Sequence, residues 1–270
     1  MELFDWKFME TKRFKEEIEM EKINLLWTSG WDSTFRLLQL SEKEVEINLF
    51  YFIDHGRKSV NIEIERMEEI LKKIKSLEKS KAKFNDIIYV EAEKVKKELK
   101  NDKITNSSKY LVKKYGIGTQ YEWFALYCEK NNVDLEICLE APLTATADAM
   151  KAEKCIFKNL EEEIFENKRL KLVKEGEKDN LYYLMKNFIF PVVTLTKKDM
   201  EKIAREKNWI EIMKLTWFCH QPINGKPCGY CNPCLDAMER GMEWRMPLVS
   251  RIRYYILAPI KLLYKKFKTI

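Results

Sequence analysis

The stretch that decides the fold is Ile23-Asn24-Leu25-Leu26-Trp27-Thr28-Ser29-Gly30-Trp31-Asp32-Ser33-Thr34. Its first part, Ile23–Trp27, is a short apolar run typical of a buried strand, and a helical pattern follows from Ser33 to about Leu40. A strand, a tight polar turn and a helix together form a phosphate-binding geometry. The reason is that the first N–H groups of a helix have no intrahelical partner and the helix dipole adds positive charge there.

The residues of this turn suit an anion. Gly30 lets the backbone approach a ligand closely, and Thr28, Ser29 and Ser33 supply hydroxyl donors. Asp32 would repel a bare triphosphate, so we expect it to hold Mg²⁺, which neutralises the phosphates. The turn lacks the spacing and the lysine of the usual P-loop. The alternative interpretation is a strand that ends in an ordinary Asp/Ser helix cap.

Apolar runs and helical patterns alternate along the rest of the chain. Further strands are predicted at 47–53, 86–91, 135–139 and 188–193, and helices at 61–77, 93–100, 120–128, 151–169 and 197–208, with a polar loop at 101–108. This alternation predicts a parallel sheet with right-handed crossovers. The strand at 135–139 should lie beside the first strand, which creates the switch point where doubly wound sheets bind ligands.

Four cysteines form a second pattern, C-x8-C-x2-C-x2-C, made by Cys219, Cys228, Cys231 and Cys234. Glycines and prolines between them supply the turns that such spacings need. Four thiolates favour tetrahedral Zn²⁺, and a closed set of this kind leaves no open catalytic position, so the metal is expected to be structural. Unligated thiols or an iron–sulfur cluster are the alternatives. His220 could compete with Cys219 as a ligand.

Composition and charge restrict the function classes. The 270 residues are 46% hydrophobic and 34% charged, which is typical of a globular protein, and the formal net charge is +6. No acidic residue follows Glu243, while that segment holds seven Lys and Arg; subtracting seven from +6 leaves the first 244 residues at −1. A near-neutral body argues against a nucleic-acid binder. With no secretory signal or membrane-spanning stretch visible, we expect a reduced, cytoplasmic protein.

The basic segment from Pro247 to Ile270 mixes apolar and cationic residues. It is expected to be a terminal helix docked on the body or on the mate in a homodimer, with Pro259 interrupting one continuous helix. The alternative is an amphipathic segment that lies on an acidic membrane surface or a partner.

The turn resembles that of the PP-loop ATP pyrophosphatases, or adenine nucleotide alpha-hydrolase-like enzymes, which carry Ser-Gly-Gly-x-Asp-Ser at this point. Gly30, Asp32 and Ser33 match, while Thr28 stands for the first Ser and Ser29 for the first Gly. Within that superfamily, the 7-cyano-7-deazaguanine synthases of queuosine biosynthesis combine the same turn with a C-terminal four-cysteine zinc site. The chain is therefore similar to these synthases in two separate motifs.

Three further stretches extend the resemblance from about Ile23 to Gly241. The stretch 52–57, with Phe52, Asp54 and Arg57, resembles the end of the synthases' second strand, which borders the nucleotide. Residues 191–200 resemble their Pro-Leu…Leu-Thr-Lys-x-Glu-Ile stretch, with the matched lysine at Lys197. Residues 215–219, Leu-Thr-Trp-Phe-Cys, resemble the Leu-Thr-Trp-Ser-Cys that precedes their zinc site.

The chain also departs from the synthases. The middle turn keeps Gly118 but has no arginine after it, and the loop Glu140–Met150 matches neither their Asn-containing loop nor their Tyr-Pro-Asp-Cys segment. Both stretches flank the acceptor. The resemblance therefore implies the ATP machinery but not the synthases' own acceptor.

The resemblance implies an ATP-dependent ligase or synthase that adenylates a carboxylate or amide oxygen of a small metabolite and releases pyrophosphate. Ammonia or another nucleophile then displaces AMP. Asp32, Ser33 and Lys197 would be catalytic; Asp32 would bind Mg²⁺ and Lys197 would neutralise phosphate charge. The nucleotide would be bound by Trp27, Thr28, Ser29, Gly30, Trp31, Asp32, Ser33, Thr34, Phe52, Asp54, Arg57 and Gly118.

Several interpretations compete with these assignments. Lys197 could be a solvated lysine, Arg57 could pair with Glu63 or Glu65, and Trp31 could cover the edge of the core. A sulfur-inserting or tRNA-modifying PP-loop enzyme is an alternative function. A zinc-ribbon module that binds nucleic acid or protein, with a vestigial ATP site, is an alternative of another class.

The sequence thus predicts an α/β fold with a doubly wound, mostly parallel five-stranded sheet and a small C-terminal zinc-binding helical appendage. The expected organisation is a lead-in at 1–22, a PP-loop ATP-binding domain at 23–195, a helical four-cysteine region at 196–245 and a basic amphipathic tail at 246–270.

Overall fold

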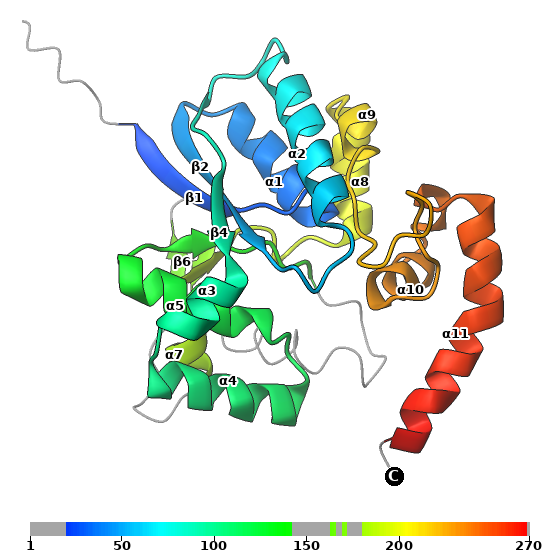
Figure 1. Ribbon diagram of the computed structural model, residues 1–270. Coiled ribbons are helices and arrows are strands. Elements are labelled where there is room, and N and C mark those ends of the chain that lie inside the picture. Colours follow the sequence, from blue (N-terminus) through cyan, green and yellow to red (C-terminus); the bar gives the residue numbers. More distant parts are fainter. Residues whose placement is uncertain (1–19, 142–162, 166–168, 172–179, 269–270) are drawn as a thin grey trace, which may run out of the picture.

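A sheet with helices on both faces organises the chain, as seen in a computed structural model that describes residues 20–141, 163–165, 169–171 and 180–268 (Figure 1). The strands are β1 (Glu21–Leu26), β2 (Val45–Ile53), β3 (Lys83–Phe84), β4 (Ile88–Glu91), β5 (Leu135–Glu136), β6 (Glu163–Phe165), β7 (Arg169–Lys171) and β8 (Phe188–Phe190). Their order is β3-β2-β1-β5-β8-β7-β6, and β4 also pairs with β2.

Six of the eight strands in the described ranges are joined in parallel. β1 pairs with β2 on one side and with β5 on the other, with Leu25 opposite Leu49 and Glu136. β3 and β4 follow one another along β2, and β8 continues the parallel sheet beyond β5. The predicted mostly parallel α/β sheet and the place of the fourth predicted strand beside the first are confirmed. The predicted number of five strands is wrong.

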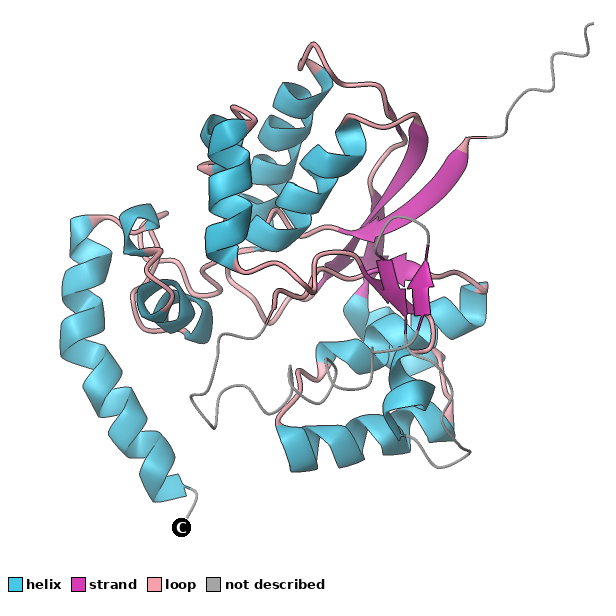
Figure 2. Ribbon diagram, turned by 180° about the vertical axis from the view of Figure 1, so that it is seen from behind, coloured by secondary structure: helices cyan, strands magenta, loops and turns pink. Residues whose placement is uncertain are grey.

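Helices cover both faces of the sheet (Figures 1 and 2). One face carries α1 (Trp31–Ser41), α2 (Val60–Lys75), α8 (Lys197–Glu206) and α9 (Ile210–Met213); the other carries α3 (Ala92–Glu98), α4 (Asp102–Tyr115), α5 (Gln120–Asn131) and α7 (Asn180–Met185). Beyond α9 follow α10 (Asn232–Glu239), the 3₁₀ turn η2 (Glu243–Arg245) and α11 (Leu248–Lys268).

The core explains why these segments form strands and helices. Side chains of β1 and β2 are buried against both layers, since a parallel sheet between helices has no solvated face. On the first face Phe35 of α1 packs edge-on against Trp209, with ring centroids 6.0 Å apart. On the second face Phe52 of β2 packs against Phe124 and Tyr127 of α5, at 4.8 and 5.3 Å.

The polar loop predicted at 101–108 is wrong, because α4 begins at Asp102. The side chain of Asn101 accepts hydrogen bonds from the N–H groups of Lys103 and Ile104 and so caps the helix. Ile104 and Leu111 bury one face of the helix, which overrides the low helix propensity of the intervening Thr, Asn and Ser residues.

Part of the helix predicted at 151–169 is also wrong. Residues 163–165 form β6 and residue 169 begins β7, and these two antiparallel strands join the sheet beside β8. Helical periodicity in a charged segment could not reveal this pairing, because the partner strand β8 is distant in sequence. The rest of that prediction, 151–162 and 166–168, lies outside the described residues.

The tail forms a single helix, α11, in which Pro259 lies without ending the helix, so the predicted interruption is wrong. Its beginning is anchored: the Ser250 hydroxyl is buried and donates a hydrogen bond to the carbonyl of Pro227. In both views the helix stands at one edge of the molecule, beyond α10 and apart from the sheet (Figures 1 and 2). Within the part of the chain that is described, no helix combines the length and the apolar character needed to cross a membrane.

Candidate functional site

The turn between β1 and α1 leaves the start of α1 open. Gly30 precedes the helix in an extended conformation, with φ −70° and ψ 165°, and no side chain caps this end. The first N–H groups of α1 are therefore left to a ligand or to solvent. A Cβ on Gly30 would lie 3.3 Å from Oγ1 of Thr28, so a side chain here would crowd the turn.

Contacts from both sides hold this turn in place. Ser29 has a φ of 52°, in the left-handed region that non-glycine residues seldom occupy. Its carbonyl accepts a hydrogen bond from the N–H of Trp217 at 2.9 Å. The indole N–H of Trp27 donates to the hydroxyl of Thr34 at 3.0 Å. The turn is thus fixed partly by a residue that lies almost two hundred positions later in the chain.

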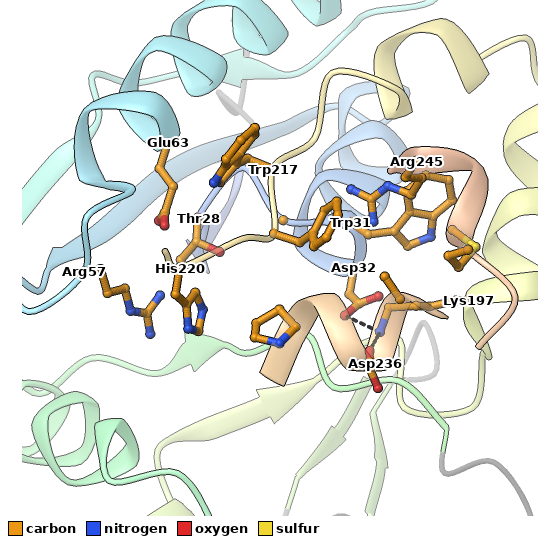
Figure 3. A pocket seen from close by; sticks show the side chains of 15 residues that line it. Thr28, Trp31, Asp32, Arg57, Glu63, Lys197, Trp217, His220, Asp236 and Arg245 are labelled. Atoms are coloured by element: carbon orange, nitrogen blue, oxygen red, sulfur yellow. Dashed lines mark hydrogen bonds and ion pairs between the residues drawn. The ribbon is translucent and has the colours of Figure 1, made fainter. Parts of the chain in front are cut away.

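A cleft with two lobes opens at the turn, and Figure 3 shows the side chains that line the inner lobe. The inner lobe, a cavity of about 190 Å³, lies between two walls and the segment that carries Arg57 and Glu63. The turn wall consists of Thr28, Gly30, Trp31 and Asp32. The C-terminal wall consists of Lys197, Trp217, Phe218, His220, Pro233, Asp236, Ala237, Met242 and Arg245.

The outer lobe, of about 660 Å³, adjoins the inner one. The two lobes share the residues Asp32, Lys197, His220, Pro233 and Asp236. Gln120, Cys138, Leu139, Glu140, Gln221, Cys231, Asn232 and Arg240 complete the outer lobe. The shared residues stand where a ligand in one lobe would meet a ligand in the other.

Lys197 is the central cation of the cleft. Its ammonium lies 3.9 Å from a carboxylate oxygen of Asp32 and 3.2 Å from one of Asp236, and it also pairs with Glu140. The side chain is only 14% exposed, so the interpretation of Lys197 as a solvated lysine is wrong. Burial alone would lower the pKa of Lys197, but the three carboxylates raise it above its ordinary value, so the amine stays charged.

Glu140 is the most buried carboxylate of this group. It pairs with Lys197 and with Arg240, whose Nη1 lies 3.0 Å from Oε2. Burial and the nearby Asp32 raise the pKa of Glu140 to about 7, although Lys197 and Arg240 oppose the shift. Burial also acts on Asp236, but Lys197 and Arg240 bring the pKa of Asp236 below its ordinary value. One carboxyl of the cleft therefore titrates near neutral pH while its neighbour stays ionised.

Arg245 is a cleft residue that sequence reasoning missed. Its guanidinium lies between the rings of Trp31 and Phe218, at 4.9 and 4.7 Å from their centroids, and donates to the Thr216 hydroxyl at 2.7 Å. Burial lowers the pKa of Arg245 to about 10, which leaves it a cation at neutral pH. Among the described residues, no carboxylate forms an ion pair with it. Arg245 is one of the seven basic residues counted after Glu243, but no local sequence motif indicates that it lines a cleft.

Arg57 stands at the far side of the inner lobe and pairs with Asp54, at 3.7 Å. The alternative pairing of Arg57 with Glu63 or Glu65 is not seen. Glu63 instead accepts hydrogen bonds from the hydroxyls of Tyr51, at 3.0 Å, and Ser59, at 2.6 Å. Asp54 also accepts from the N–H of Gly56 at 3.1 Å, which shapes the segment that carries Arg57.

The structure does not bring all predicted site residues to the cleft. Trp27, Ser29, Ser33 and Thr34 are buried beneath the turn, where they support it. The ring of Phe52 belongs to the core on the other face of the sheet. Residues Asp54 and Gly118 lie near the cleft, beside Arg57 and Gln120 respectively, but line neither lobe.

The four cysteines lie together, as their spacing predicts. All four are buried, and their sulfur atoms lie within 4.8 Å of one another. Sγ–Sγ distances of 3.8 Å join Cys228 to Cys234 and Cys231 to Cys219, and 3.4 Å separates Cys231 from Cys234. Four thiolates bound to Zn²⁺ at about 2.3 Å in a tetrahedron would have their sulfurs ~3.8 Å apart. The set therefore fits a tetrahedral metal ion such as zinc.

Backbone groups around the sulfurs fit the same interpretation. The N–H groups of Cys228 and Cys231 point to the sulfurs of Cys219 and Cys228, at 3.1 and 3.2 Å, which would stabilise thiolates. His220 lies in both lobes of the cleft and outside this four-sulfur set. The cysteine cluster also fixes the start of α10, because Cys231 is the N-cap of this helix. α10 and its C-cap in turn place Asp236 and Arg240 at the cleft.

The two described thiols outside the cluster are not activated. Burial raises the pKa of Cys128 to about 12 and that of Cys138 well above its ordinary value. Cys155 lies outside the described residues. The sequence matches no protein-family model, and no curated protein is significantly similar to it.

Proposed function

We propose that the protein is an ATP-dependent ligase of the PP-loop type, which forms AMP and pyrophosphate while joining a nitrogen nucleophile to a small acceptor. The observation that carries this proposal is the meeting of Asp32 and Lys197, 3.9 Å apart, at the open start of α1. A carboxylate that can hold a metal, a buried cation and free helix N–H groups are what a nucleotide's phosphates need in one place.

The turn wall would bind the phosphates. N–H groups at the start of α1 and the hydroxyl of Thr28 are donors at the inner lobe. Oδ1 of Asp32 is buried and has no hydrogen-bond partner among the described residues, which leaves it available to a cation. Bound there, Mg²⁺ would supply neutralisation of the phosphate charge.

Cations on the opposite side would complete the phosphate site. Lys197 and Arg245 reach the inner lobe from the C-terminal wall, and Arg57 reaches it from the segment after β2. Their charges would stabilise the pyrophosphate as it leaves. Positioning and charge stabilisation of this kind supply most of the rate enhancement in phosphoryl-transfer enzymes.

The reaction would proceed in two steps. First, an oxygen of the acceptor's carboxylate or amide attacks the α-phosphorus, the bond from that phosphorus to the bridging oxygen breaks, and pyrophosphate leaves. Second, ammonia or an amine attacks the activated carbon, and AMP leaves with the acceptor's oxygen while the nucleophile loses a proton. The outer lobe adjoins the turn wall at Asp32 and Lys197, so it is the place for the acceptor.

The cysteine cluster is assigned a structural zinc ion. Its four buried sulfurs match the distances of a closed tetrahedral site, which leaves no position for a substrate. The ion would hold the start of α10, and through it Asp236 and Arg240, against the cleft. A sulfur-inserting reaction that uses Cys138, which lines the outer lobe, is disfavoured, because the pKa of its thiol is raised well above its ordinary value.

Oxygen transfer tests the proposal directly. The full chain is incubated with ATP, Mg²⁺, ammonium and a panel of small carboxylic acids and amides labelled with ¹⁸O, and the nucleotide products are examined by mass spectrometry. We expect AMP and pyrophosphate, with one ¹⁸O atom in the AMP, for the acceptor that supports turnover. Formation of ADP and phosphate, or RNA binding with no nucleotide turnover across the panel, would contradict it.

Two lysines at the start of α8 provide a matched control. Lys197→Met removes the buried cation, and Lys198→Met makes the same chemical change at the next, exposed position. We expect the first change to lower kcat/KM by about 100-fold or more, as for loss of one preorganised transition-state contact, and the second to leave it within about twofold.

A further inference from the structure

The helix α11 exposes an apolar stripe. Leu248, Ile252, Tyr255 and Ile256 are 66%, 50%, 69% and 60% exposed, and they stand at positions i, i+4, i+7 and i+8 of the helix. They therefore share one side of α11. The sequence continues this spacing beyond Ile256 with apolar residues at 260, 263 and 267. Such a stripe is unusual on a protein surface and marks a site of interaction.

The charge of the same segment has one sign. From 244 to 270 the chain has seven Lys and Arg and no Asp or Glu, whereas the first 244 residues are nearly neutral. Six of these cations lie in α11, at 251, 253, 261, 265, 266 and 268. The helix thus combines an exposed apolar stripe with a strong positive charge, and its segment has no acidic residue to neutralise that charge.

The start of α11 is fixed to the body. Gly229 of the cysteine turn has a φ of +90°, and a Cβ there would lie 2.2 Å from the carbonyl oxygen of Ser250, so the two backbones meet closely. The hydrogen bond from the Ser250 hydroxyl to Pro227 adds to this anchor. From this point the helix stands apart from the sheet at the edge of the molecule (Figure 1), and the four side chains of its apolar stripe are exposed.

We infer that α11 binds an anionic lipid surface and lies in its plane, with the stripe of Leu248, Ile252, Tyr255 and Ile256 turned toward the acyl chains. Amphipathic helices bind in this way when apolar side chains enter the headgroup boundary and cations attract acidic lipids. The flexible stems of lysine and arginine let their charges stay in water beside such a stripe. The inference does not depend on the nucleotide chemistry of the cleft.

The charge pattern favours lipid over a second copy of the chain. In a dimer formed along α11, two segments with seven cations each and no acid would approach one another, which is unfavourable. An acidic bilayer supplies the opposite charge. Pro259 has no backbone N–H, so the carbonyl four residues earlier in α11 loses its helical hydrogen bond. At a lipid surface, water and lipid headgroups can bond to that carbonyl, and the proline is tolerated.

Vesicle flotation with the full chain tests the inference. The probes are vesicles of phosphatidylcholine alone and of phosphatidylcholine with about 30 mol % phosphatidylserine, a fraction that gives a clearly negative surface. We expect at least about tenfold stronger binding to the acidic vesicles. Raising the salt from about 0.1 M to about 1 M, which shortens the Debye length from ~10 Å to ~3 Å, should remove most of this preference.

Two variants separate the stripe from the rest of the helix. Ile256→Glu places a charge in the stripe, and Leu257→Glu places the same charge on roughly the opposite side, at a position that is also exposed. We expect the first to weaken binding by about tenfold or more and the second by clearly less, since only the first removes apolar area from the interface. Circular dichroism and light scattering accompany both variants.

Three outcomes would overturn the inference. The first is equal binding to neutral and acidic vesicles, or to neither. The second is equal loss of binding in the two variants. The third is a dimer, seen by light scattering, that Ile256→Glu separates into monomers and Leu257→Glu does not. Because nucleotide turnover is assayed without lipid, failure of the ligase proposal would leave these results unchanged.

Discussion

The two walls of the cleft are built in different ways. The turn wall comes from four residues of one short stretch, 28–32, and the local pattern of strand, turn and helix specifies its shape. The C-terminal wall collects residues from α8, the segment after α9, α10 and η2, spread from 197 to 245. Its geometry depends on tertiary packing and on the cysteine cluster. A contiguous wall can be recognised from a motif, whereas an assembled wall requires the fold.

The largest effect is expected from Cys231→Ser, which should remove the C-terminal wall and spare the turn wall. Loss of one of four metal ligands should release bound zinc and destabilise residues 215–246 by at least about 5 kcal/mol. Zinc content and hydrogen exchange of each segment measure this. Cys128→Ser, a similar change in a buried thiol outside the cluster, should retain the metal. Equal loss of protection in β1 and α1 would show that the walls are not separable.

Asp32→Ala tests whether the turn wall serves function rather than stability. Oδ1 of Asp32 is buried with no hydrogen-bond partner among the described residues, and Lys197, which pairs with Oδ2, would keep Glu140 and Asp236 as partners. The substitution should therefore change the free energy of unfolding by less than about 1 kcal/mol. AMP formation should fall about 1,000-fold, equivalent to about 4 kcal/mol. Urea unfolding and the isotope assay measure the two effects. Asp86→Ala, at an exposed position before β4, is the control; full turnover by Asp32→Ala would contradict the assignment.

Glu140→Gln should remove a pH dependence that arises where Glu140 of the outer lobe pairs with Lys197 of the C-terminal wall. The pKa of Glu140 in the folded state, about 7, lies above its unfolded value near 4.5. The stability that protonated Glu140 contributes is therefore fully present below pH 4.5 and is lost as the pH rises through 7. The loss amounts to about 3 kcal/mol at alkaline pH.

Urea unfolding between pH 4 and pH 9 measures the contribution of Glu140. The difference between the wild-type and Glu140→Gln curves should follow this window. Glu239→Gln, at an exposed carboxyl on α10, should leave the wild-type pH profile in place. If Glu140→Gln and wild type showed parallel profiles, the titrating carboxyl would have to lie elsewhere.

Arg245→Met tests a residue that joins the two walls, since Arg245 stacks on Trp31 of the turn wall. If its cation contacts the phosphates of bound ATP, the change should raise KM for ATP about 30-fold, equivalent to about 2 kcal/mol, with a smaller effect on kcat. Steady-state kinetics with varied ATP measure this. Arg205→Met, at an exposed arginine of α8, is the control. An unchanged KM would leave Arg245 with only a packing role.

Sequence reasoning succeeded where neighbouring residues determine structure. It placed the first strand, the turn and α1 correctly, because apolar periodicity and Gly30 lie within twelve residues. The closely spaced glycines and prolines of the cysteine segment predicted that its four thiols would meet. Lys197 was found through a motif, although its partners were not.

The failures have physical reasons. In the sequence, nothing distinguishes Glu140, Asp236 and Arg240 from other charged residues. Their burial and their ion pairs depend on elements that are remote in sequence. α4 was missed, although Asn101 as a cap and Gly116 in the left-handed conformation after Tyr115 were available signals. Pro259 was given too much weight, because α11 continues through it.

The hydrogen bond between the carbonyl of Ser29 and the N–H of Trp217 ties the opening motif to a late segment. Residues after 195, among them Met200, Ala204 and Trp209, complete the same core that surrounds Trp27 and Phe35. A fragment that stops at residue 195 would expose this core and lose the brace on the turn. For this protein, dissection at a boundary drawn from motifs would destroy the very module that it is meant to isolate.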